Sequence, residues 1–264
     1  MRFTKMHGLG NDYIFLNCMD GIPDDLPGLA RRLSDRHFGV GGDGVICVCP
    51  SRRADFRMRM FNADGSEGAM CGNGIRCFGK YVYDRGLTDR AHLTIETGAG
   101  ERELSLLMEN GAVKGAVVGM GAPVLGEPVA LLLGGDPYTA VPVSMGNPHA
   151  VIEADDPARL DLSALGPLAE RSPAFPQRVN AEFVRVLDRG RLELRVWERG
   201  SGETLACGTG ACASVCAMAV AGKLDREAVV RLPGGELAVR WEEKSGQVFM
   251  TGPAVTVFDG EIDS

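Results

Sequence analysis

Met70-Cys71-Gly72-Asn73-Gly74 and Ala206-Cys207-Gly208-Thr209-Gly210 share one pattern: a cysteine, a glycine, any residue and a second glycine, each ahead of a run that predicts a helix. The two cysteines are separated by 136 residues in a chain of 264, which is close to half of its length. This spacing indicates that the chain contains two copies of one structural unit.

The same offset relates features that are far from the cysteines. It brings 57–61 onto 193–197, two runs that alternate polar and apolar residues as a half-buried strand does. It also brings Gly10-Asn11 onto Gly146-Asn147, Glu67 onto Glu203 and Gly86 onto Gly222. The last pair is well placed to end the two helices. Several features in one register favour duplication of an αβ unit.

Composition excludes several classes of protein. A net charge of −7 argues against binding to a nucleic-acid backbone, and 45% hydrophobic residues are ordinary for a soluble globular protein. Residues 1–7 do not resemble a signal peptide, and the most apolar stretch, 211–221, is too short to span a membrane. We therefore expect a cytoplasmic protein with reduced cysteines. The cysteine spacings match no common zinc pattern, so no metal site is expected.

The periodicity of apolar residues predicts the secondary structure. In the first half we expect strands over 3–7, 13–18, 45–48, 56–61, 93–95, 104–108 and 113–118, with helices over 24–36 and 75–85. In the second half we expect strands over 141–145, 150–152, 183–187, 192–197, 229–232, 237–241 and 248–250, with helices over 161–170 and 211–221. The first of those two helices should be interrupted at Gly166-Pro167. The second is apolar all round, so strands should enclose it.

These elements predict an α/β (α+β) fold made of two pseudo-symmetric domains. The first would comprise 1–118 together with 252–264, since the strand-like stretch 254–258 is expected to return to it, and the second would comprise 119–251.

The position of Cys71 and Cys207 suggests a chemical role. Backbone N–H groups at a helix start are free and favour an anion, and they also favour the thiolate form of a nearby cysteine. Two such cysteines on opposite sides of one α-carbon could remove a proton from one face and deliver a proton to the other. If both helix starts hold a carboxylate, they would stabilise the negative charge that spreads onto it from the α-carbon, and this design needs no cofactor.

Two other interpretations of these cysteines remain open. A free cysteine is usually a small buried hydrophobic residue, and the pair could also form a disulfide in an oxidised, inactive form. The duplication favours the catalytic interpretation for Cys71 and Cys207. The structural interpretation is kept for the other six cysteines, Cys18, Cys47, Cys49, Cys77, Cys212 and Cys216.

Five separated motifs resemble those of the diaminopimelate epimerase family. They are 6–12, 61–66 with 70–76, 145–149, and 198–200 continuing through 211. The resemblance covers nearly the whole chain and implies two α/β domains, each with a mostly antiparallel sheet curled around a central helix. It also implies a homodimeric isomerase that acts on a small molecule, interconverting LL- and meso-2,6-diaminopimelate without a cofactor.

The resemblance further implies which residues form the site. The family's catalytic cysteines match Cys71 and Cys207. Its substrate-contact positions match Asn11, Asn62, Gly72, Asn73, Asn147, Asn180, Glu198, Arg199, Gly208 and Thr209. His149 could tune a cysteine or could be structural. Some relatives carry a glutamine where this chain has Gly44, and the offset relates Gly44 to Asn180, so the contact on that side of the substrate is an open question.

Two rival functions are consistent with parts of the pattern. The same chemistry could act on another amino acid, such as a proline derivative, but Glu198 and Arg199 favour a substrate with a second amino-acid head group. A thiol redox or ligand-binding protein is the alternative of another class, and the lack of a Cys-x-x-Cys pair counts against it.

Overall fold

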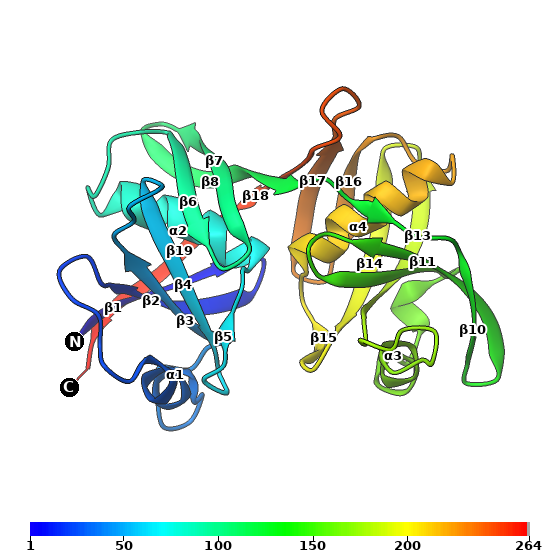
Figure 1. Cartoon of the computed structure of the whole chain (residues 1–264), viewed down its shortest axis with the longest axis horizontal. Helices are drawn as coiled ribbons and strands as arrows, with labels where there is room; N and C mark the ends of the chain where they lie inside the picture. The colour runs from blue at the N-terminus through cyan, green and yellow to red at the C-terminus, as the bar shows by residue number, and fades with distance from the viewer. Residues whose placement is uncertain (263–264) are drawn as a thin grey trace. The chain divides into compact units, whose positions relative to one another are not determined.

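The computed structural model describes residues 1–262 and divides the chain into two compact units. Unit 1 comprises Met1–Val118 together with the C-terminal segment from Thr251, and unit 2 comprises Gly119–Met250. The last two residues of the expected first domain, 263–264, lie outside the described part. Each boundary falls within a strand, β8 (Ala112–Gly121) or β18 (Val248–Pro253). Figure 1 shows that strands surround a helix in both units.

Unit 1 is built from strands that pair mostly antiparallel. Its further elements are β1 (Arg2–Gly8), β2 (Asn11–Asn17), α1 (Leu26–Ser34), β3 (Gly44–Cys49), β4 (Phe56–Asn62), β5 (Glu67–Gly68), α2 (Gly72–Asp84), β6 (His92–Thr97), β7 (Gly100–Glu109) and β19 (Val255–Glu261). β1 pairs with both β2 and β19, so the end of the chain returns to unit 1 as predicted. The parallel pairs, β2 with β3 and β4 with β6, are joined by α1 and α2 as crossover helices.

Unit 2 repeats this arrangement. Its elements are β9 (Val124–Leu125), β10 (Val129–Leu133), β11 (Asp136–Ser144), β12 (Pro148–Glu153), η1 (Pro157–Arg159), α3 (Leu162–Glu170), β13 (Asn180–Asp188), β14 (Arg191–Glu198), β15 (Gly202–Thr204), α4 (Gly208–Val220), β16 (Glu227–Leu232) and β17 (Gly235–Trp241). The parallel pairs are again the two that helices connect, β12 with β13 and β14 with β16.

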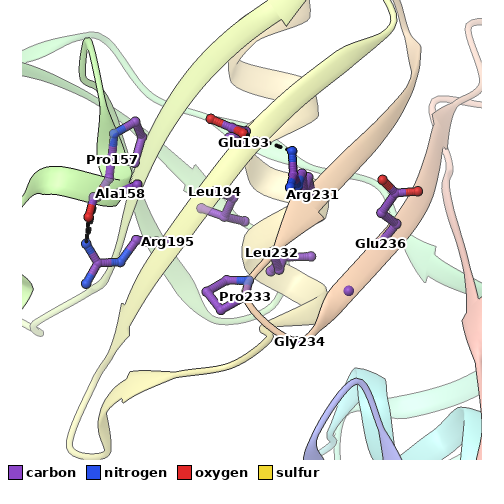
Figure 2. Close-up of a pocket in the computed structure, with 11 residues that line it drawn as sticks. Pro157, Ala158, Glu193, Leu194, Arg195, Arg231, Leu232, Pro233, Gly234 and Glu236 are labelled. Atoms are coloured by element: carbon purple, nitrogen blue, oxygen red, sulfur yellow. Dashed lines mark hydrogen bonds and ion pairs between the residues drawn. The ribbon is translucent and has the colours of Figure 1, made fainter.

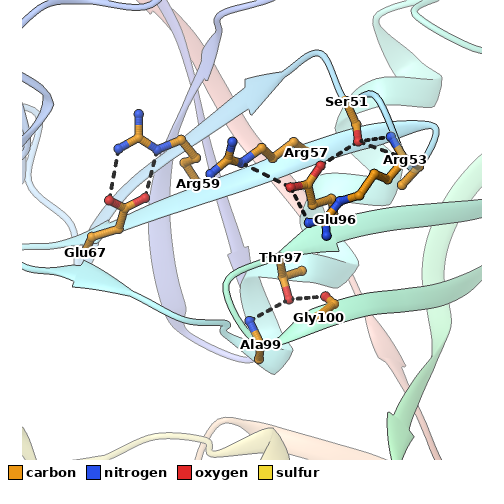
Figure 3. A network of polar contacts seen from close by, with 10 residues as sticks. Ser51, Arg53, Arg57, Arg59, Glu67, Glu96, Thr97, Ala99 and Gly100 are labelled. Atoms are coloured by element: carbon orange, nitrogen blue, oxygen red, sulfur yellow. Dashed lines mark hydrogen bonds and ion pairs between the residues drawn. The ribbon is translucent and has the colours of Figure 1, made fainter.

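The duplication predicted from the cysteine spacing is confirmed in detail. α1 and α3, β3 and β13, and α2 and α4 each begin 136 residues apart. A side-chain contact is repeated too: Arg59 bonds both carboxylate oxygens of Glu67 at 2.8 and 2.9 Å, and Arg195 pairs with Glu203 at 2.8 Å. Figure 3 shows the first of these pairs between β4 and β5. The two units therefore share both topology and the ion pair that joins the short strand to its neighbour.

The two central helices are buried in different ways. α2 turns Ile75, Phe78, Tyr81 and Val82 inward, as its apolar spacing predicts. α4 is buried along Gly208–Met218 on all sides and contacts β11, β12, β13, β14, β16 and β17. Full burial of one large apolar side chain stabilises a fold by about 2 kcal/mol, so these helices contribute much of each core. The prediction that strands enclose α4 is confirmed.

The glycines predicted to end the two central helices do so, whereas the break predicted within α3 is absent. α2 and α4 are followed by Gly86 (φ 65°) and Gly222 (φ 72°), the left-handed positions that favour glycine after a helix. The predicted interruption at Gly166-Pro167 is wrong, because α3 runs without a break over Leu162–Glu170. The carbonyl of Pro167 still accepts the Arg171 N–H at 3.2 Å, so the helix continues past the ring. Within residues 1–262, no helix is both long and apolar enough to cross a membrane.

Candidate active site

The two motif cysteines occupy the same place at the start of equivalent helices. Cys71 is the N-cap of α2, and its sulfur accepts the Gly74 backbone N–H at 3.3 Å. Cys207 is the N-cap of α4, and its sulfur accepts the Gly210 N–H at 3.4 Å. Each sulfur takes the position that a capping oxygen usually takes at the first turn of a helix. The predicted placement of both cysteines at helix starts is confirmed.

The second glycine of each motif lets the helix approach a strand closely. A Cβ on Gly74 would lie 2.6 Å from Cδ1 of Ile46 on β3. A Cβ on Gly210 would lie 2.7 Å from Oε1 of Glu182 on β13. A side chain at either position would therefore require the side chain of Ile46 or Glu182, or the helix start, to move. Ile46 and Glu182 are equivalent in the repeat, but one is apolar and the other ionisable.

In unit 1 the structure brings Asn11 to Cys71. The amide Oδ1 of Asn11 lies 3.2 Å from the cysteine sulfur, and its Nδ2 donates to Asp43 at 2.6 Å. The other two asparagines predicted for this unit make different contacts. Asn62 donates to the Ser66 hydroxyl at 2.9 Å, and Asn73 is buried and accepts from an arginine.

That arginine, Arg76, is a structural residue of unit 1 that the sequence did not single out. Its side chain is fully buried, donates to the carbonyls of Gly72 and Pro253 at 3.0 Å each, and donates to Asn73 Oδ1 at 3.1 Å. It thus fixes the first turn of α2, whose N–H groups are predicted to bind substrate, against the C-terminal segment.

In unit 2 a chain of polar contacts leads from Cys207 into the core. Thr209 Oγ1 lies 3.5 Å from the sulfur and accepts from Asn147 Nδ2 at 3.3 Å. The Asn147 Oδ1 lies 3.1 Å from Nε2 of His149, whose Nδ1 lies 2.7 Å from Oε1 of Glu182. The His149 and Glu182 side chains are fully buried. His149 is therefore connected to Cys207 through an asparagine and a threonine that the sequence had already indicated.

Glu182 was not predicted as a site residue. Its second oxygen, Oε2, has no hydrogen-bond partner within the described residues. One signal in the sequence could have identified it. The offset places a glutamate on the position of Ile46, so a charged residue replaces a buried apolar one within the repeat. Burial of a carboxylate is costly without partners, which makes such an exchange informative.

Asn180 begins β13, Glu198 ends the neighbouring strand β14, and Arg199 follows Glu198 directly. Glu198 accepts the Thr204 hydroxyl at 2.6 Å, and burial raises the pKa of its carboxyl. The Arg199 backbone N–H donates to Asn180 Oδ1 at 2.9 Å, while its exposed guanidinium donates to the Gln177 carbonyl at 3.1 Å. The guanidinium is thus accessible to an anion, whereas Glu198 faces inward.

The helix start is expected to lower the pKa of Cys207, but burial and nearby negative charges raise it. Burial raises the pKa of the Cys207 thiol well above its usual range, and the negative charges of Glu198 and Glu182 raise it further. The Thr209 hydroxyl and the Gly210 N–H act in the opposite direction and do not compensate. The prediction of a lowered pKa is therefore wrong for Cys207 in this structure, since a buried thiol among carboxylates favours the neutral form.

Gly44 is explained by close packing. A Cβ at this position would lie 2.1 Å from the Phe61 carbonyl oxygen and 3.1 Å from Cε1 of Tyr13. With this backbone, β3 has no room for a side chain where some relatives are expected to carry a glutamine. On its side of the repeat, Asn180 keeps its amide and donates to the Pro148 carbonyl at 3.1 Å.

A groove of about 540 Å³ elsewhere in unit 2 contains none of the predicted site residues. It is lined by Pro157, Ala158, Glu193–Arg195 and Arg231–Glu236 (Figure 2). Three of its charged side chains already have partners: Arg231 contacts Glu193 at 3.5 Å, and Arg195 donates to the carbonyls of Pro157 and Leu160. The residues predicted for the active site therefore lie outside this groove.

Comparisons with a family model and with known proteins point to the same family. The family model for diaminopimelate epimerase matches residues 3–126 and 141–257. The diaminopimelate epimerase of Acetivibrio thermocellus is 50% identical over 278 residues, covering 100% of this chain and 99% of its own length. That of Moorella thermoacetica is 48% identical over 277 residues, covering 99% of both chains.

Solved structures share the fold at low identity. A PhzF-family phenazine biosynthesis protein from Bacillus anthracis is 18% identical with a TM-score of 0.74, covering 100% of this chain and 99% of its own. A probable proline racemase from Agrobacterium radiobacter K84 is 17% identical with a TM-score of 0.77, covering 99% and 92%. The predicted α/β fold class is confirmed. The family model and the relatives at about half identity along the full chain go further: this chain belongs to the diaminopimelate epimerase family of isomerases.

Proposed function

We propose that the protein interconverts LL- and meso-2,6-diaminopimelate without a cofactor, using Cys71 and Cys207 as two acid–base groups. The observation that carries the proposal is the capping of two equivalent helices by a cysteine, in a chain of the diaminopimelate epimerase family. None of the other six cysteines has a cysteine at the equivalent position of the repeat, so both units share the cysteine at the helix start alone.

In the proposed reaction the substrate loses one proton and gains one. One cysteine, as thiolate, takes the α-proton and becomes a thiol, while the other thiol delivers its proton to the opposite face and becomes a thiolate. The two sulfurs exchange roles with the direction of reaction. The scheme requires the sulfurs to lie on opposite faces of one α-carbon when substrate is bound.

The substrate's two ends would be held by different groups. The reacting carboxylate suits the backbone N–H groups of Gly72, Asn73, Gly208 and Thr209, which lie in the first turns of α2 and α4. At the distal end, the exposed guanidinium of Arg199 could bind a second carboxylate, and Glu198 an ammonium group. Asn11, Asn62, Asn147 and Asn180 offer both donors and acceptors to a zwitterion.

Cys207 must lose its proton before it can act as a base. Glu198 is well suited to assist, because burial raises the pKa of its own carboxyl and its negative charge contributes to the raised pKa of Cys207. We assign His149 a tuning role through Asn147 and Thr209, in keeping with the contacts that connect it to the sulfur.

We also propose a cytoplasmic homodimer. Cys18, Cys47, Cys49, Cys77, Cys207 and Cys216 are not in disulfides, which suits a reducing compartment. Val255, Val257 and Phe258 on β19 are 39%, 53% and 46% exposed, an apolar row that a second copy could cover. Light scattering coupled to size exclusion tests this point: Val257→Glu should yield monomer if β19 forms the interface.

The proposed activity is tested by chiral separation of products after incubation with LL-diaminopimelate under reducing conditions, with L-proline in a parallel reaction. Formation of meso-diaminopimelate without racemisation of proline supports the proposal. Racemisation of proline instead would identify the rival substrate class. Dithiol oxidation without any change in stereochemistry would favour a redox protein.

A further inference from the structure

Behind Asn11, a network of charged side chains holds Asp43 in place. The Asp43 Oδ2 accepts the Asn11 side-chain amide at 2.6 Å and the Asp12 backbone N–H at 3.1 Å. Its Oδ1 accepts from Arg36 at 2.9 Å. Arg36 also bonds Asp12, which pairs with the buried Lys5 at 2.7 Å. The Asp43 carboxylate therefore has a fixed orientation.

The direction of these hydrogen bonds determines how the Asn11 amide is turned. A carboxylate offers only acceptors, so the amide nitrogen of Asn11 must face Asp43. The amide oxygen then faces the sulfur of Cys71, 3.2 Å away. Since an amide oxygen is only an acceptor, this contact is favourable when Cys71 is a thiol that donates its S–H, and unfavourable when it is a thiolate.

Unit 2 has no counterpart of this arrangement. The offset places Val179 on the position of Asp43. The equivalent asparagine, Asn147, is turned the other way: its oxygen faces His149, and its nitrogen donates to Thr209, which contacts the sulfur of Cys207. The orientation of the amide thus differs between the units, and Asp43 accounts for the orientation in unit 1.

We propose that Asp43 is a positioning residue that locks the Asn11 amide with its oxygen toward Cys71, and thereby favours the thiol form of Cys71. For catalysis this rests on the proposed function, in which Cys71 would then be the proton donor when substrate arrives. The chemical claim about Cys71 itself does not depend on any substrate.

The experiment measures the alkylation rate of Cys71 by iodoacetamide between pH 6 and 10, with the modified peptide quantified by mass spectrometry. Without Asp43 the amide can rotate and offer its nitrogen to the sulfur. Asp43→Ala should therefore accelerate alkylation at pH 7 about fivefold, the factor that corresponds to one ordinary hydrogen bond. Asp43→Asn, which keeps the shape but can present either amide atom, should give a smaller acceleration.

A double-mutant cycle with Asn11→Ala separates the amide from the charge of Asp43. If the amide carries the effect, Asp43→Ala changes the rate less than about twofold in the Asn11→Ala protein. An unchanged rate in the single variants, or an equal acceleration with and without Asn11, overturns the proposal. The buried Cys47 and Cys77 must stay unmodified, which verifies that each variant is folded. If the cycle behaves as expected but no diaminopimelate is turned over, the proposed function fails and this inference stands.

Discussion

The two helix starts have nearly the same backbone but different chemical surroundings. Cys71 and Cys207 have φ of −129° and −124° and cap their helices in the same way. Yet Cys71 is partly exposed beside a neutral amide, whereas Cys207 is 5% exposed and near two carboxylates and a histidine. Duplication has kept the scaffold that holds each sulfur, and substitution around it has made the two sulfurs chemically unequal.

The substitutions that cause this difference can be named from the repeat. Tyr13, Ile46 and Asn62 of unit 1 correspond to His149, Glu182 and Glu198 of unit 2. Three ionisable groups thus surround Cys207 where unit 1 has groups that are neutral at physiological pH. A two-base epimerase needs one thiol and one thiolate at a time. In this structure the surroundings of both sulfurs favour the thiol, so one cysteine must lose its proton when substrate binds.

The largest expected effect tests what the two sites share. Cys71→Ser and Cys207→Ser should each lower the rate of epimerisation by about 10⁴-fold, since a serine is too weak an acid and base to replace either partner. The assay is conversion of LL- to meso-diaminopimelate. Cys77→Ala and Cys212→Ala, which remove a cysteine from the same two helices, are the controls and should retain most activity. Substantial activity in either serine variant would rule out two essential bases.

The second largest effect concerns the buried pair of His149 and Glu182, which has no equivalent in unit 1. Glu182→Ile, which installs the residue of unit 1, leaves His149 without its carboxylate partner and should destabilise the protein by about 3 kcal/mol. Urea unfolding measures the change. The double variant Glu182→Ile with His149→Tyr replaces both members by the residues of unit 1, so its cost should be smaller than the sum of the single costs. Additive costs would mean that the pair is not coupled.

A smaller effect tests how the charge of Glu198 makes Cys207 differ from Cys71. Glu198→Gln removes a negative charge that raises the pKa of Cys207, so that pKa should fall and Cys207 should be alkylated faster at a given pH. Epimerisation should nevertheless slow by about 10²-fold if Glu198 assists proton transfer. Glu193→Gln, on the same strand but paired with Arg231, is the matched control and should change neither quantity. Slower alkylation of Cys207 in Glu198→Gln would contradict the assigned sign.

The smallest effect concerns the repeated ion pair. Arg59 and Glu67 are partly exposed, so Arg59→Ala should cost less than about 1 kcal/mol of unfolding free energy. Arg195 also donates to the carbonyls of Pro157 and Leu160, at 2.7 and 2.8 Å. Arg195→Ala should therefore cost more than Arg59→Ala, by about 1 kcal/mol. Equal costs in urea unfolding would show that these carbonyl contacts contribute nothing.

The duplication could be predicted from sequence because it is a matter of spacing. A single offset related the cysteines, the asparagines Asn11 and Asn147, and the helix-ending glycines, and the structure confirms equivalent elements at those positions. The enclosed α4 was also predictable, because a helix that is apolar on every side needs cover on every side.

The surroundings of the sulfurs could not be predicted in the same way. The pKa of Cys207 depends on burial and on the charges of Glu198 and Glu182. Neither the burial nor the approach of Glu182, which lies on β13, is visible in the motif around Cys207. The lock on Asn11 needs a carboxylate that lies 32 positions away along the chain and close in space. The prediction at Pro167 failed because it relied on local sequence alone. Proline disfavours the interior of a helix, but its one missing N–H did not end α3.

The most direct test of the two-cysteine account follows hydrogen isotopes in the first moments of reaction. LL-diaminopimelate is incubated with the protein in deuterated water, and substrate and product are separated and weighed by mass spectrometry. The account predicts that the first meso product carries one α-deuterium while the recovered LL isomer carries almost none, because separate groups remove and deliver the proton. Deuterium entering the LL isomer as fast as it enters the product would indicate a single base and would contradict the account.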